Sequence, residues 1–192
     1  MGILSYGMIA SLDGYVAGPD GDFSWAEPDE EVHRFVNERD RHVGTYLYGR
    51  RMFEVMRFWD DDAALADAPE YIREYAAIWQ AADKVVFSTS IEPPSLPRTR
   101  LERRFDPDAI RALKSSVRGD LAVAGAGLAA AALRADLVDE LTVYVAPVSV
   151  GEGTPLLPRG LFLRLELLEE RRFASGMLFL RYRVLDAPEE GR

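Results

Sequence analysis

Short apolar segments alternate with amphipathic helical segments along most of this chain, and this alternation constrains the fold more than any other feature. Strands are predicted at 3–10, 45–48, 84–87, 121–124 and 141–146. Helices are predicted from Asp29, over 50–56, from Pro69, from Asp106-Pro107, and from the Gly125 turn to Leu133. Two later segments, 161–168 and 177–185, are predicted to form a C-terminal β-hairpin. This order is typical of an α/β protein whose mainly parallel sheet has an antiparallel edge.

Length and composition narrow the class of protein further. The 192 residues favour one domain over 1–187, followed by a short tail at 188–192 that is expected to fray. The formal net charge of −9 argues against binding to nucleic acid or to anionic membranes, because like charges repel. The absence of cysteine excludes disulfides and cysteine-ligated metals, and two separated histidines predict no metal site. No signal peptide or bilayer-spanning run is visible, so we expect a cytoplasmic protein.

A ligand of an open α/β sheet binds beyond the carboxyl ends of the strands. Small residues, hydroxyls or glycines follow each predicted strand, in segments 10–14, 49–52, 88–90, 125–128 and 148–154. Two of these segments, Gly49-Arg50-Arg51 and Gly125-Ala126-Gly127, open predicted helices, whose free N–H groups attract anions. The arginines and the hydroxyls of Ser88 and Thr89 would add contacts to phosphate oxygens. Two separated anion sites at one sheet edge suit a dinucleotide.

The glycines alone are a weak signal for a nucleotide. Ala130 stands where the last glycine of the usual G-x-G-x-x-G fingerprint would be. Simple strand-to-helix turns are therefore the alternative interpretation of both glycine segments.

The same positions match a family pattern that covers nearly the whole chain. The matching stretches, in the order of the family, are Ser11–Ala17, Tyr48–Glu54, Val86–Thr89, Val123–Leu128, Leu137–Leu141 leading to Pro147-Val148, Gly151–Leu156 and Leu178–Tyr182. On these residues the chain resembles the dihydrofolate reductase-like superfamily. More closely, it is similar to the reductase domain of bacterial riboflavin-biosynthesis deaminase–reductases and its stand-alone relatives. The resemblance implies a three-layer α/β/α fold.

The resemblance also implies a cofactor and the residues that bind it. NADPH would be the hydride donor, with its nicotinamide beside Ala10, Gly14 and the rest of the 11–17 loop. The adenosine side, including the 2′-phosphate, would be held by Gly49, Arg50, Arg51, Ser88 and Thr89. The pyrophosphate would lie on the turn formed by Gly125, Ala126, Gly127 and Leu128.

Three departures from the family pattern bear on this assignment. Ala124 replaces the first glycine of a Gly-Gly pair, where an unusual backbone conformation would suit alanine poorly. Met52 replaces a threonine, which removes one hydroxyl contact to phosphate. The third departure concerns the carboxylate of the first helix, whose position falls near Glu30, Glu31 or His33 without matching one of them. Beyond these departures, we expect no deaminase domain like that of the bifunctional enzymes, with its zinc-binding cysteines and histidine.

The candidate catalytic residues are Asp13, Glu31 and His33. Asp13 either orients the loop over the nicotinamide or caps local N–H groups of a turn. In folate reductases a carboxylate of the first helix helps to protonate the substrate, and that role falls near Glu30, Glu31 or His33. For His33 the alternative is a solvated or partly buried histidine without a role in proton transfer.

The resulting prediction is an NADPH-dependent reductase that transfers hydride to a small nitrogen heterocycle or an imine-like substrate. The most similar known reaction is that of 5-amino-6-(5-phosphoribosylamino)uracil reductase in riboflavin biosynthesis. Dihydrofolate reductase activity is one alternative, and a nucleotide-binding protein without turnover is another, which Met52 and Ala124 favour slightly. We expect a homodimer, since the apolar terminal hairpin has an edge to cover.

Overall fold

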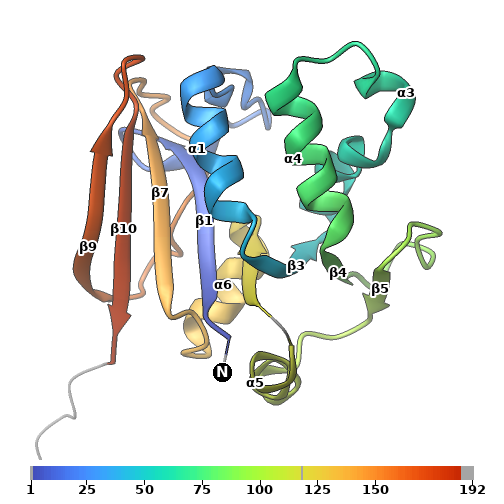
Figure 1. The fold of residues 1–192 in the computed structure, drawn as a ribbon. Helices are drawn as coiled ribbons and strands as arrows, with labels where there is room; N and C mark the ends of the chain where they lie inside the picture. Colours follow the sequence, from blue (N-terminus) through green and yellow to red (C-terminus); the bar gives the residue numbers. More distant parts are fainter. Residues whose placement is uncertain (1, 118, 187–192) are drawn as a thin grey trace, which may run out of the picture.

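The computed structural model describes residues 2–117 and 119–186, in which an eight-stranded sheet lies between two layers of helices (Figure 1). In spatial order the strands are β5 (Thr99–Glu102), β4 (Asp83–Phe87), β3 (Val43–Gly49), β6 (Asp120–Ala124), β1 (Leu4–Ser11), β7 (Glu140–Ala146), β10 (Leu178–Leu185) and β9 (Arg164–Arg172). The longer helices are α1 (Glu30–Asp40), α2 (Arg50–Met56), α4 (Glu70–Ala81), α5 (Pro107–Ser116) and α6 (Ala126–Arg134). The smaller elements are β2 (Tyr15–Ala17), which pairs with β8 (Thr154–Pro155), the 3₁₀ helices η1 (Ser24–Ala26) and η2 (Arg57–Asp60), and α3 (Asp62–Leu65).

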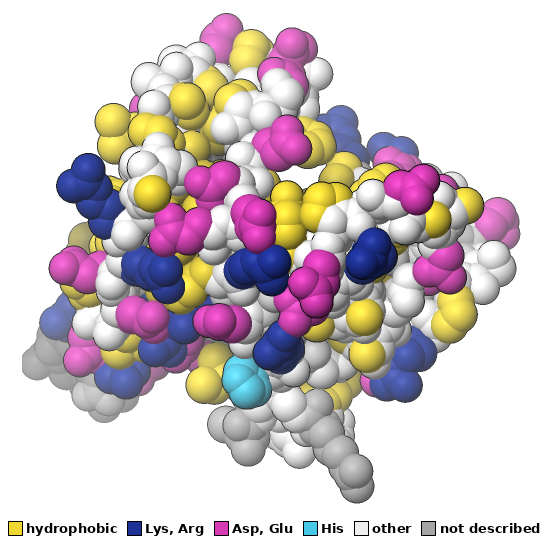
Figure 2. All heavy atoms as spheres, turned by 45° about the horizontal axis from the view of Figure 1, so that its top comes forward, with side chains coloured by type: hydrophobic (Ala, Val, Ile, Leu, Met, Phe, Trp, Pro, Cys, Tyr) yellow, Lys and Arg dark blue, Asp and Glu magenta, His cyan; other side chains and the backbone are white. Residues whose placement is uncertain are grey.

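The direction of the strands brings all the predicted ligand segments to one edge. Neighbouring strands from β5 to β7 are parallel, whereas β10 runs antiparallel to both β7 and β9. This confirms the predicted α/β/α fold with a mainly parallel sheet and an antiparallel C-terminal hairpin. The carboxyl ends of the parallel strands lie at the top of Figure 1, which we call the carboxyl edge. Figure 2 tips this edge toward the viewer and shows hydrophobic atoms in a hollow among charged side chains.

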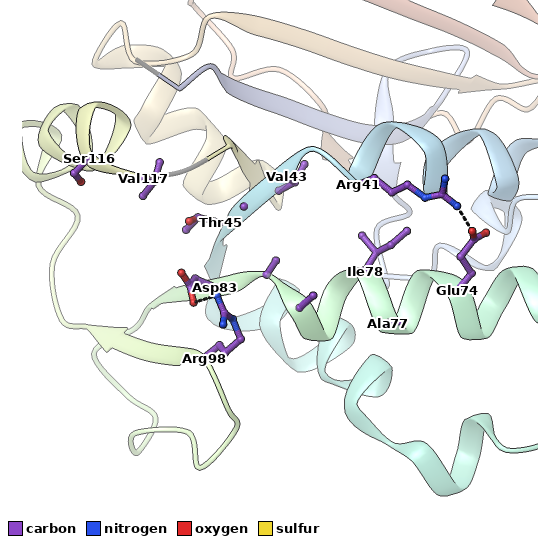
Figure 3. A pocket seen from close by; sticks show the side chains of 13 residues that line it. Arg41, Val43, Thr45, Glu74, Ala77, Ile78, Asp83, Arg98, Ser116 and Val117 are labelled. Atoms are coloured by element: carbon purple, nitrogen blue, oxygen red, sulfur yellow. Dashed lines mark hydrogen bonds and ion pairs between the residues drawn. The ribbon is translucent and has the colours of Figure 1, made fainter.

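A cavity of about 800 Å³ opens at the opposite edge, where β3 and β4 begin (Figure 3). Its charged groups already form ion pairs, Arg41 with Glu74 and Arg98 with Asp83. None of the residues predicted to bind a ligand lines this cavity. It is therefore separate from the predicted site.

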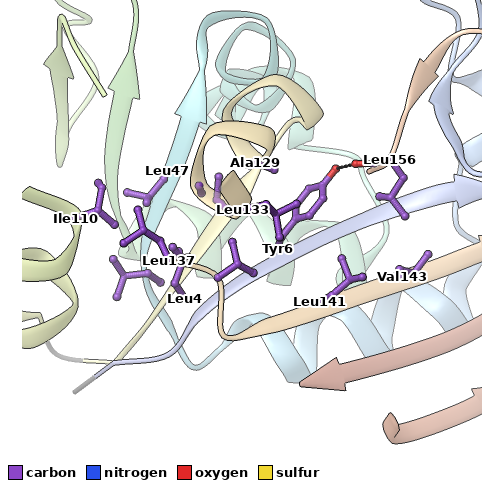
Figure 4. Packing of buried hydrophobic residues seen from close by; sticks show 14 of the residues in the cluster. Leu4, Tyr6, Leu47, Ile110, Ala129, Leu133, Leu137, Leu141, Val143 and Leu156 are labelled. Atoms are coloured by element: carbon purple, nitrogen blue, oxygen red, sulfur yellow. Dashed lines mark hydrogen bonds between the residues drawn. The ribbon is translucent and has the colours of Figure 1, made fainter. Parts of the chain in front are cut away.

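The two faces of the sheet bury different side chains. Aliphatic residues such as Leu4, Leu47 and Leu133 fill the face covered by α5 and α6, where the hydroxyl of Tyr6 donates to the carbonyl of Leu156 at 2.9 Å (Figure 4). Aromatic residues fill the face covered by α1, α2 and α4, and Trp79 there is fully buried. Both faces are covered, which explains why the central strands read as almost continuous apolar segments.

Local sequence signals place most elements correctly. Asp29 caps α1 by accepting a hydrogen bond from the N–H of Val32 at 2.9 Å, and Asp106 caps α5 as predicted. The first strand of the hairpin was predicted at 161–168, which is too early in the chain, because the strand that pairs with β10 spans Arg164–Arg172. Strand β5 was missed, since it is short and follows a proline-rich segment.

Two expectations concern other parts of the chain. The predicted tail at 188–192 lies outside the described residues, and the single-domain boundary stays a prediction. No helix among the described residues has the length and apolar character needed to cross a bilayer.

Candidate functional site

The turns after β3 and β6 lie side by side at the centre of the carboxyl edge. Tyr48 and Ala124 are register partners at the ends of these two strands. A Cβ atom built on Gly49 would lie 3.8 Å from the Cβ of Leu128, in the first turn of α6. The structure thus brings Gly49 and the Gly125–Leu128 turn together, as predicted from their positions after parallel strands.

Glycine is needed at Gly125 for two reasons. Its φ of +92° lies in the region that favours glycine, and a Cβ there would be only 3.0 Å from the Cβ of Met52. By contrast, a Cβ at Gly127 would meet no atom within 4 Å, so open space adjoins the start of α6. Ala124 is the last residue of β6, and the unusual backbone conformation occurs one residue later. The first departure from the family pattern therefore causes no backbone strain.

Arginines follow two of the parallel strands, β3 and β5, at the carboxyl edge. Arg50 and Arg51 begin α2 and are exposed, and Arg50 pairs with Glu54 at 3.2 Å. Arg103 follows β5 and donates to the carbonyl oxygens of Ser88 at 3.2 Å and Ile91 at 2.7 Å. Arg104 beside it is also exposed. This part of the site is rich in guanidinium groups although the chain as a whole is acidic.

The sequence analysis missed Arg103 and Arg104 because it did not predict β5. Ser88 is buried, and its hydroxyl oxygen accepts a hydrogen bond from the N–H of Ser90 at 3.2 Å, whereas Thr89 is exposed. The carbonyl of Glu102 accepts from the N–H of Ser88 at 3.0 Å, which fixes the two segments together. A basic pair directly after a short strand, next to a serine-rich turn, is the signal that would have identified them.

Asp13 links the turn after β1 to the segment after β7. Its carboxylate accepts hydrogen bonds from the Ser149 hydroxyl at 2.8 Å and from the N–H groups of Val150 at 3.2 Å and Gly151 at 2.7 Å. Hydrogen bonding, with the Ser11 hydroxyl making the largest contribution, lowers the pKa of Asp13 well below its usual value. Asp13 is therefore ionised at neutral pH. Asp13 therefore caps N–H groups, as one of the two interpretations predicted. These N–H groups belong to Val150 and Gly151, however, and not to the turn that contains Asp13.

Ala10 and Gly14 flank this turn in different ways. Ala10 lies in β1 with its side chain buried in the core, so only its backbone remains for a ligand. Gly14 has a φ of +84°, and a Cβ there would meet no atom within 4 Å. Leu12, between them, is one of the most exposed large apolar side chains of the described residues.

The acidic candidates at the start of α1 both form ion pairs. Glu31 accepts from the guanidinium of Arg171 at 3.1 Å and from the N–H of Ala174 at 3.0 Å, and so attaches the β9–β10 turn to α1. Glu30 pairs with Arg34 at 2.9 Å. The interactions of both carboxylates stabilise the local structure.

His33 lies between α1 and α4 and is only 7% exposed. Its Nδ1 is 3.1 Å from the side-chain oxygen of Asn37, and its ring makes edge contacts with Trp59, Tyr71 and Tyr75 at centroid distances of 5.1 to 6.0 Å. Burial lowers the pKa of His33, so the imidazole is neutral at pH 7. A neutral imidazole has one donor and one acceptor nitrogen, the form in which histidine passes on protons.

Comparisons with known proteins agree with this geometry. The family described as the RibD C-terminal domain matches residues 3–179. The "Uncharacterized protein YyaP" of Bacillus subtilis (strain 168) is 25% identical over 178 residues, which cover 91% of both chains. Among solved structures, a putative riboflavin biosynthesis protein from Shewanella sp. PV-4 superposes with a TM-score of 0.74 at 19% identity, covering 96% of this chain and 99% of that one.

Two further structures share the fold. The diaminohydroxyphosphoribosylaminopyrimidine deaminase/5-amino-6-(5-phosphoribosylamino)uracil reductase of Thermotoga maritima has a TM-score of 0.66 at 15% identity. The match covers 96% of this chain but only 57% of the longer bifunctional protein. Dihydrofolate reductase from Enterococcus faecalis, complexed with NADP(H), has a TM-score of 0.63 at 13% identity, with coverage of 96% and 97%.

Proposed function

This chain belongs to the RibD C-terminal domain family, and from that membership we propose that it is an NADPH-dependent reductase. Its substrate would be a small nitrogen heterocycle or an imine-like compound, and the reaction most like its own is that of the pyrimidine reductases of riboflavin biosynthesis. The observation that carries the proposal is that the turns after β3, β4 and β6, with their glycines, hydroxyls and arginines, lie at the ends of neighbouring parallel strands. Membership in the family of a reductase domain supports the reaction type.

The residues of this edge fit a phosphorylated dinucleotide. The open space beside Gly127 leaves room for a pyrophosphate against the first turn of α6, whose nine residues contribute a helix dipole. Arg50, Arg51 and Arg103 would hold the 2′-phosphate, together with the Ser88 segment. Because Gly125 has no side chain, its turn packs directly against Met52. A cofactor bound at this turn would therefore lie close to the ends of the strands. When bound, NADPH supplies a hydride to the substrate.

Asp13 and His33 take different roles in this proposal. Asp13 holds the 148–151 segment against the turn after β1, and it acts as a positioning residue for the nicotinamide end of the site. His33 is the candidate in the first helix that forms no ion pair among the described residues, and it keeps a proton on one nitrogen at neutral pH. The proton that accompanies the hydride would come from water, and the neutral imidazole of His33 would pass it on only by accepting one proton as it releases another.

A fluorescence titration followed by turnover tests the proposal. Energy transfer from protein to NADPH should saturate on titration, and addition of the pyrimidine substrate or dihydrofolate should then oxidise the cofactor. Binding without oxidation of any acceptor would favour a nucleotide-binding protein without turnover. Preferential oxidation with dihydrofolate would favour dihydrofolate reductase activity. No binding of NADPH would refute the reductase assignment.

We also propose that two copies associate through β9. Among residues 2–117 and 119–186, this nine-residue strand is the last of the sheet and has one side without a paired strand, and Leu167 on it is 48% exposed. An exposed strand edge with an apolar side chain is a template for pairing with a second chain. Light scattering after gel filtration should give the mass of a dimer, and Leu167→Lys should shift it toward the monomer. A monomeric mass at micromolar concentration would refute this assignment.

A further inference from the structure

A chain of polar contacts crosses the buried space between α1 and α4. Asn37 of α1 is fully buried, and its side-chain nitrogen donates hydrogen bonds to the carbonyl oxygen of Tyr71 and to Oε2 of Glu74, both at 2.8 Å. Glu74 also pairs with Arg41 in the cavity at the opposite edge of the sheet (Figure 3). The side-chain oxygen of Asn37 lies 3.1 Å from Nδ1 of His33. The contacts therefore extend from Arg41 to His33 through two side chains.

The partners of Asn37 fix the orientation of its amide group. The carbonyl of Tyr71 accepts hydrogen bonds only, and so does an ionised carboxylate. Hydrogen bonding, with Asn37 making the largest contribution, lowers the pKa of Glu74, so its carboxylate is ionised at neutral pH. A reversed amide would place an oxygen against these two acceptors and would lose both hydrogen bonds in a buried position. Asn37 therefore presents its oxygen to His33.

This orientation selects one tautomer of His33. An amide oxygen needs a donor, so Nδ1 of the imidazole carries a proton. Burial lowers the pKa of His33, so the ring holds a single proton at neutral pH. The other nitrogen, Nε2, therefore keeps a lone pair. In the opposite tautomer the lone pair of Nδ1 would face the oxygen of Asn37, which is repulsive.

Nε2 of His33 is available to a ligand. It forms no hydrogen bond within residues 2–117 and 119–186. In that part of the chain, the side-chain nitrogens that are both enclosed and unpaired belong to Trp25 and Arg181, so Nε2 keeps a small open surface. Three aromatic rings of η2 and α4 hold the imidazole by edge contacts. A buried ring that is held on several sides and has one open acceptor is preorganised for a hydrogen bond from a ligand.

His33 lies on the side of the sheet where the turns of the carboxyl edge can be reached. Helix α1 begins at this edge, and His33 is its fourth residue (Figure 1). Trp59, whose ring centroid is 6.0 Å from that of His33, packs against the aromatic cluster around Tyr48, as Met52 does. Met52 in turn adjoins Gly125, at the turn proposed for the pyrophosphate. His33 and this turn therefore border the same aromatic cluster.

We infer that Nε2 of His33 accepts a hydrogen bond from an N–H group of the substrate, and that Asn37 and Glu74 are positioning residues for this contact. The inference deepens the proposed reductase function and rests on it. It suits a nitrogen heterocycle with ring N–H groups. His33 then orients the substrate and does not supply a proton, because its one proton lies between Nδ1 and the weakly basic oxygen of Asn37. The reduced nitrogen takes its proton from water.

Nitrogen NMR of the histidine rings tests the tautomer without any ligand. The chain has two histidines, of which the exposed His42 is the internal control, and His33→Gln assigns the signals. At pH 7, Nδ1 of His33 should give the signal of a protonated ring nitrogen, and Nε2 that of an unprotonated one. A proton on Nε2, or a doubly protonated ring, would overturn the inference. The measurement needs no NADPH, so its result is independent of the proposed function.

A matched pair of variants tests the positioning role. Asn37→Leu removes the oxygen that selects the tautomer and nearly keeps the side-chain volume, so part of the His33 population should carry its proton on Nε2. Glu38→Gln changes the next residue of α1, which is exposed, and should leave the tautomer unchanged. An unchanged tautomer in folded Asn37→Leu would overturn the role of Asn37. Melting curves show whether each variant is folded, and the spectra of the parent protein test the inference if Asn37→Leu is not.

A matched pair of ligands tests the contact with the substrate. Uracil has ring N–H groups, and 1,3-dimethyluracil has none. With NADP⁺ at saturation, uracil should bind about fivefold more tightly, as expected for one hydrogen bond, and should shift the Nε2 signal. His33→Phe should abolish this preference, whereas a steric effect of the methyl groups would survive the substitution.

Each other outcome of the ligand test has a defined meaning. Equal binding of the two compounds, a preference that persists in His33→Phe, or no shift of Nε2 with uracil while NADP⁺ binds would overturn the contact. If NADP⁺ does not bind, the proposed function fails and the substrate contact falls with it, whereas the tautomer and its dependence on Asn37 are decided by the NMR measurements alone. The two failures are therefore distinguishable.

Discussion

Replacing Gly127 by alanine should stabilise the fold and weaken NADPH binding at the same time. Gly127 is the second residue of α6, and a Cβ built on it meets no atom within 4 Å. The substitution therefore introduces no steric conflict in the protein. Because glycine loses more backbone freedom on folding than alanine, the gain in the free energy of unfolding should be about 0.5–1 kcal/mol.

The open space that makes Gly127→Ala harmless to the fold is the space proposed for the pyrophosphate. A methyl group there would hold the phosphate oxygens away from the N–H groups of α6. The loss of one charge-assisted hydrogen bond corresponds to about 1.5 kcal/mol, or roughly a tenfold weaker Kd for NADPH. Urea denaturation without ligand measures the first effect, and a fluorescence titration with NADPH measures the second.

Gly125→Ala is the matched comparison two residues away. Its φ of +92° and the 3.0 Å approach to Met52 should make this variant less stable by about 1–3 kcal/mol. A stabilised Gly127→Ala variant that binds NADPH as tightly as the parent protein would refute the placement of the pyrophosphate at α6. A destabilised Gly127→Ala variant would refute the reasoning from open space.

Three more predictions concern charged groups. Arg50→Ala should raise the Kd for NADPH about tenfold and leave that for NADH unchanged, with Arg103→Ala similar, because the 2′-phosphate is present only in NADPH; equal losses for both cofactors in fluorescence titrations would contradict this. Asp13→Asn should speed hydrogen exchange at the N–H groups of Val150 and Gly151, because it weakens the hydrogen bonds that protect them. The pKa of Asp13 is lower in the folded protein than in the unfolded chain, so the stability that its carboxylate adds should be lost as the pH falls below about 4. Unchanged exchange rates would exclude this role. Burial lowers the pKa of Lys84 to about 8, so between pH 8 and 10.5 the unfolded chain binds more protons than the folded protein. The free energy of unfolding should therefore rise by about 3 kcal/mol across that range relative to the Lys84→Met variant, as measured by urea titrations. Parallel pH profiles for the two proteins would show that burial does not shift this pKa.

The order of elements and the position of the site could be predicted because they depend on signals within a few residues. Asp29 and Asp106 begin helices by bonding to N–H groups two or three positions away, which a sequence shows directly. The alternation of apolar strands with helices requires parallel pairing, and parallel strands present their carboxyl ends together. The turns at Gly49, Ser88 and Gly125 therefore had to meet.

The roles of single charged side chains could not be predicted, because their partners come from distant parts of the chain. Glu31 was a candidate acid by its place in the first helix, but Arg171, 140 residues away, engages its carboxylate. One interpretation of Asp13 was that it caps N–H groups of its own turn, but its carboxylate accepts hydrogen bonds from residues 149–151. Arg103 lies at the carboxyl edge because it directly follows β5, and this four-residue strand is too short to give a clear sequence pattern.

The sequence by itself therefore determined the fold class, the direction of the sheet and the edge where a ligand can bind. Those properties follow from local propensity and periodicity, which act between neighbouring residues. Only the tertiary structure decided which charges at that edge remain free and which are paired. That decision depends on segments far apart in the sequence that the sheet brings together.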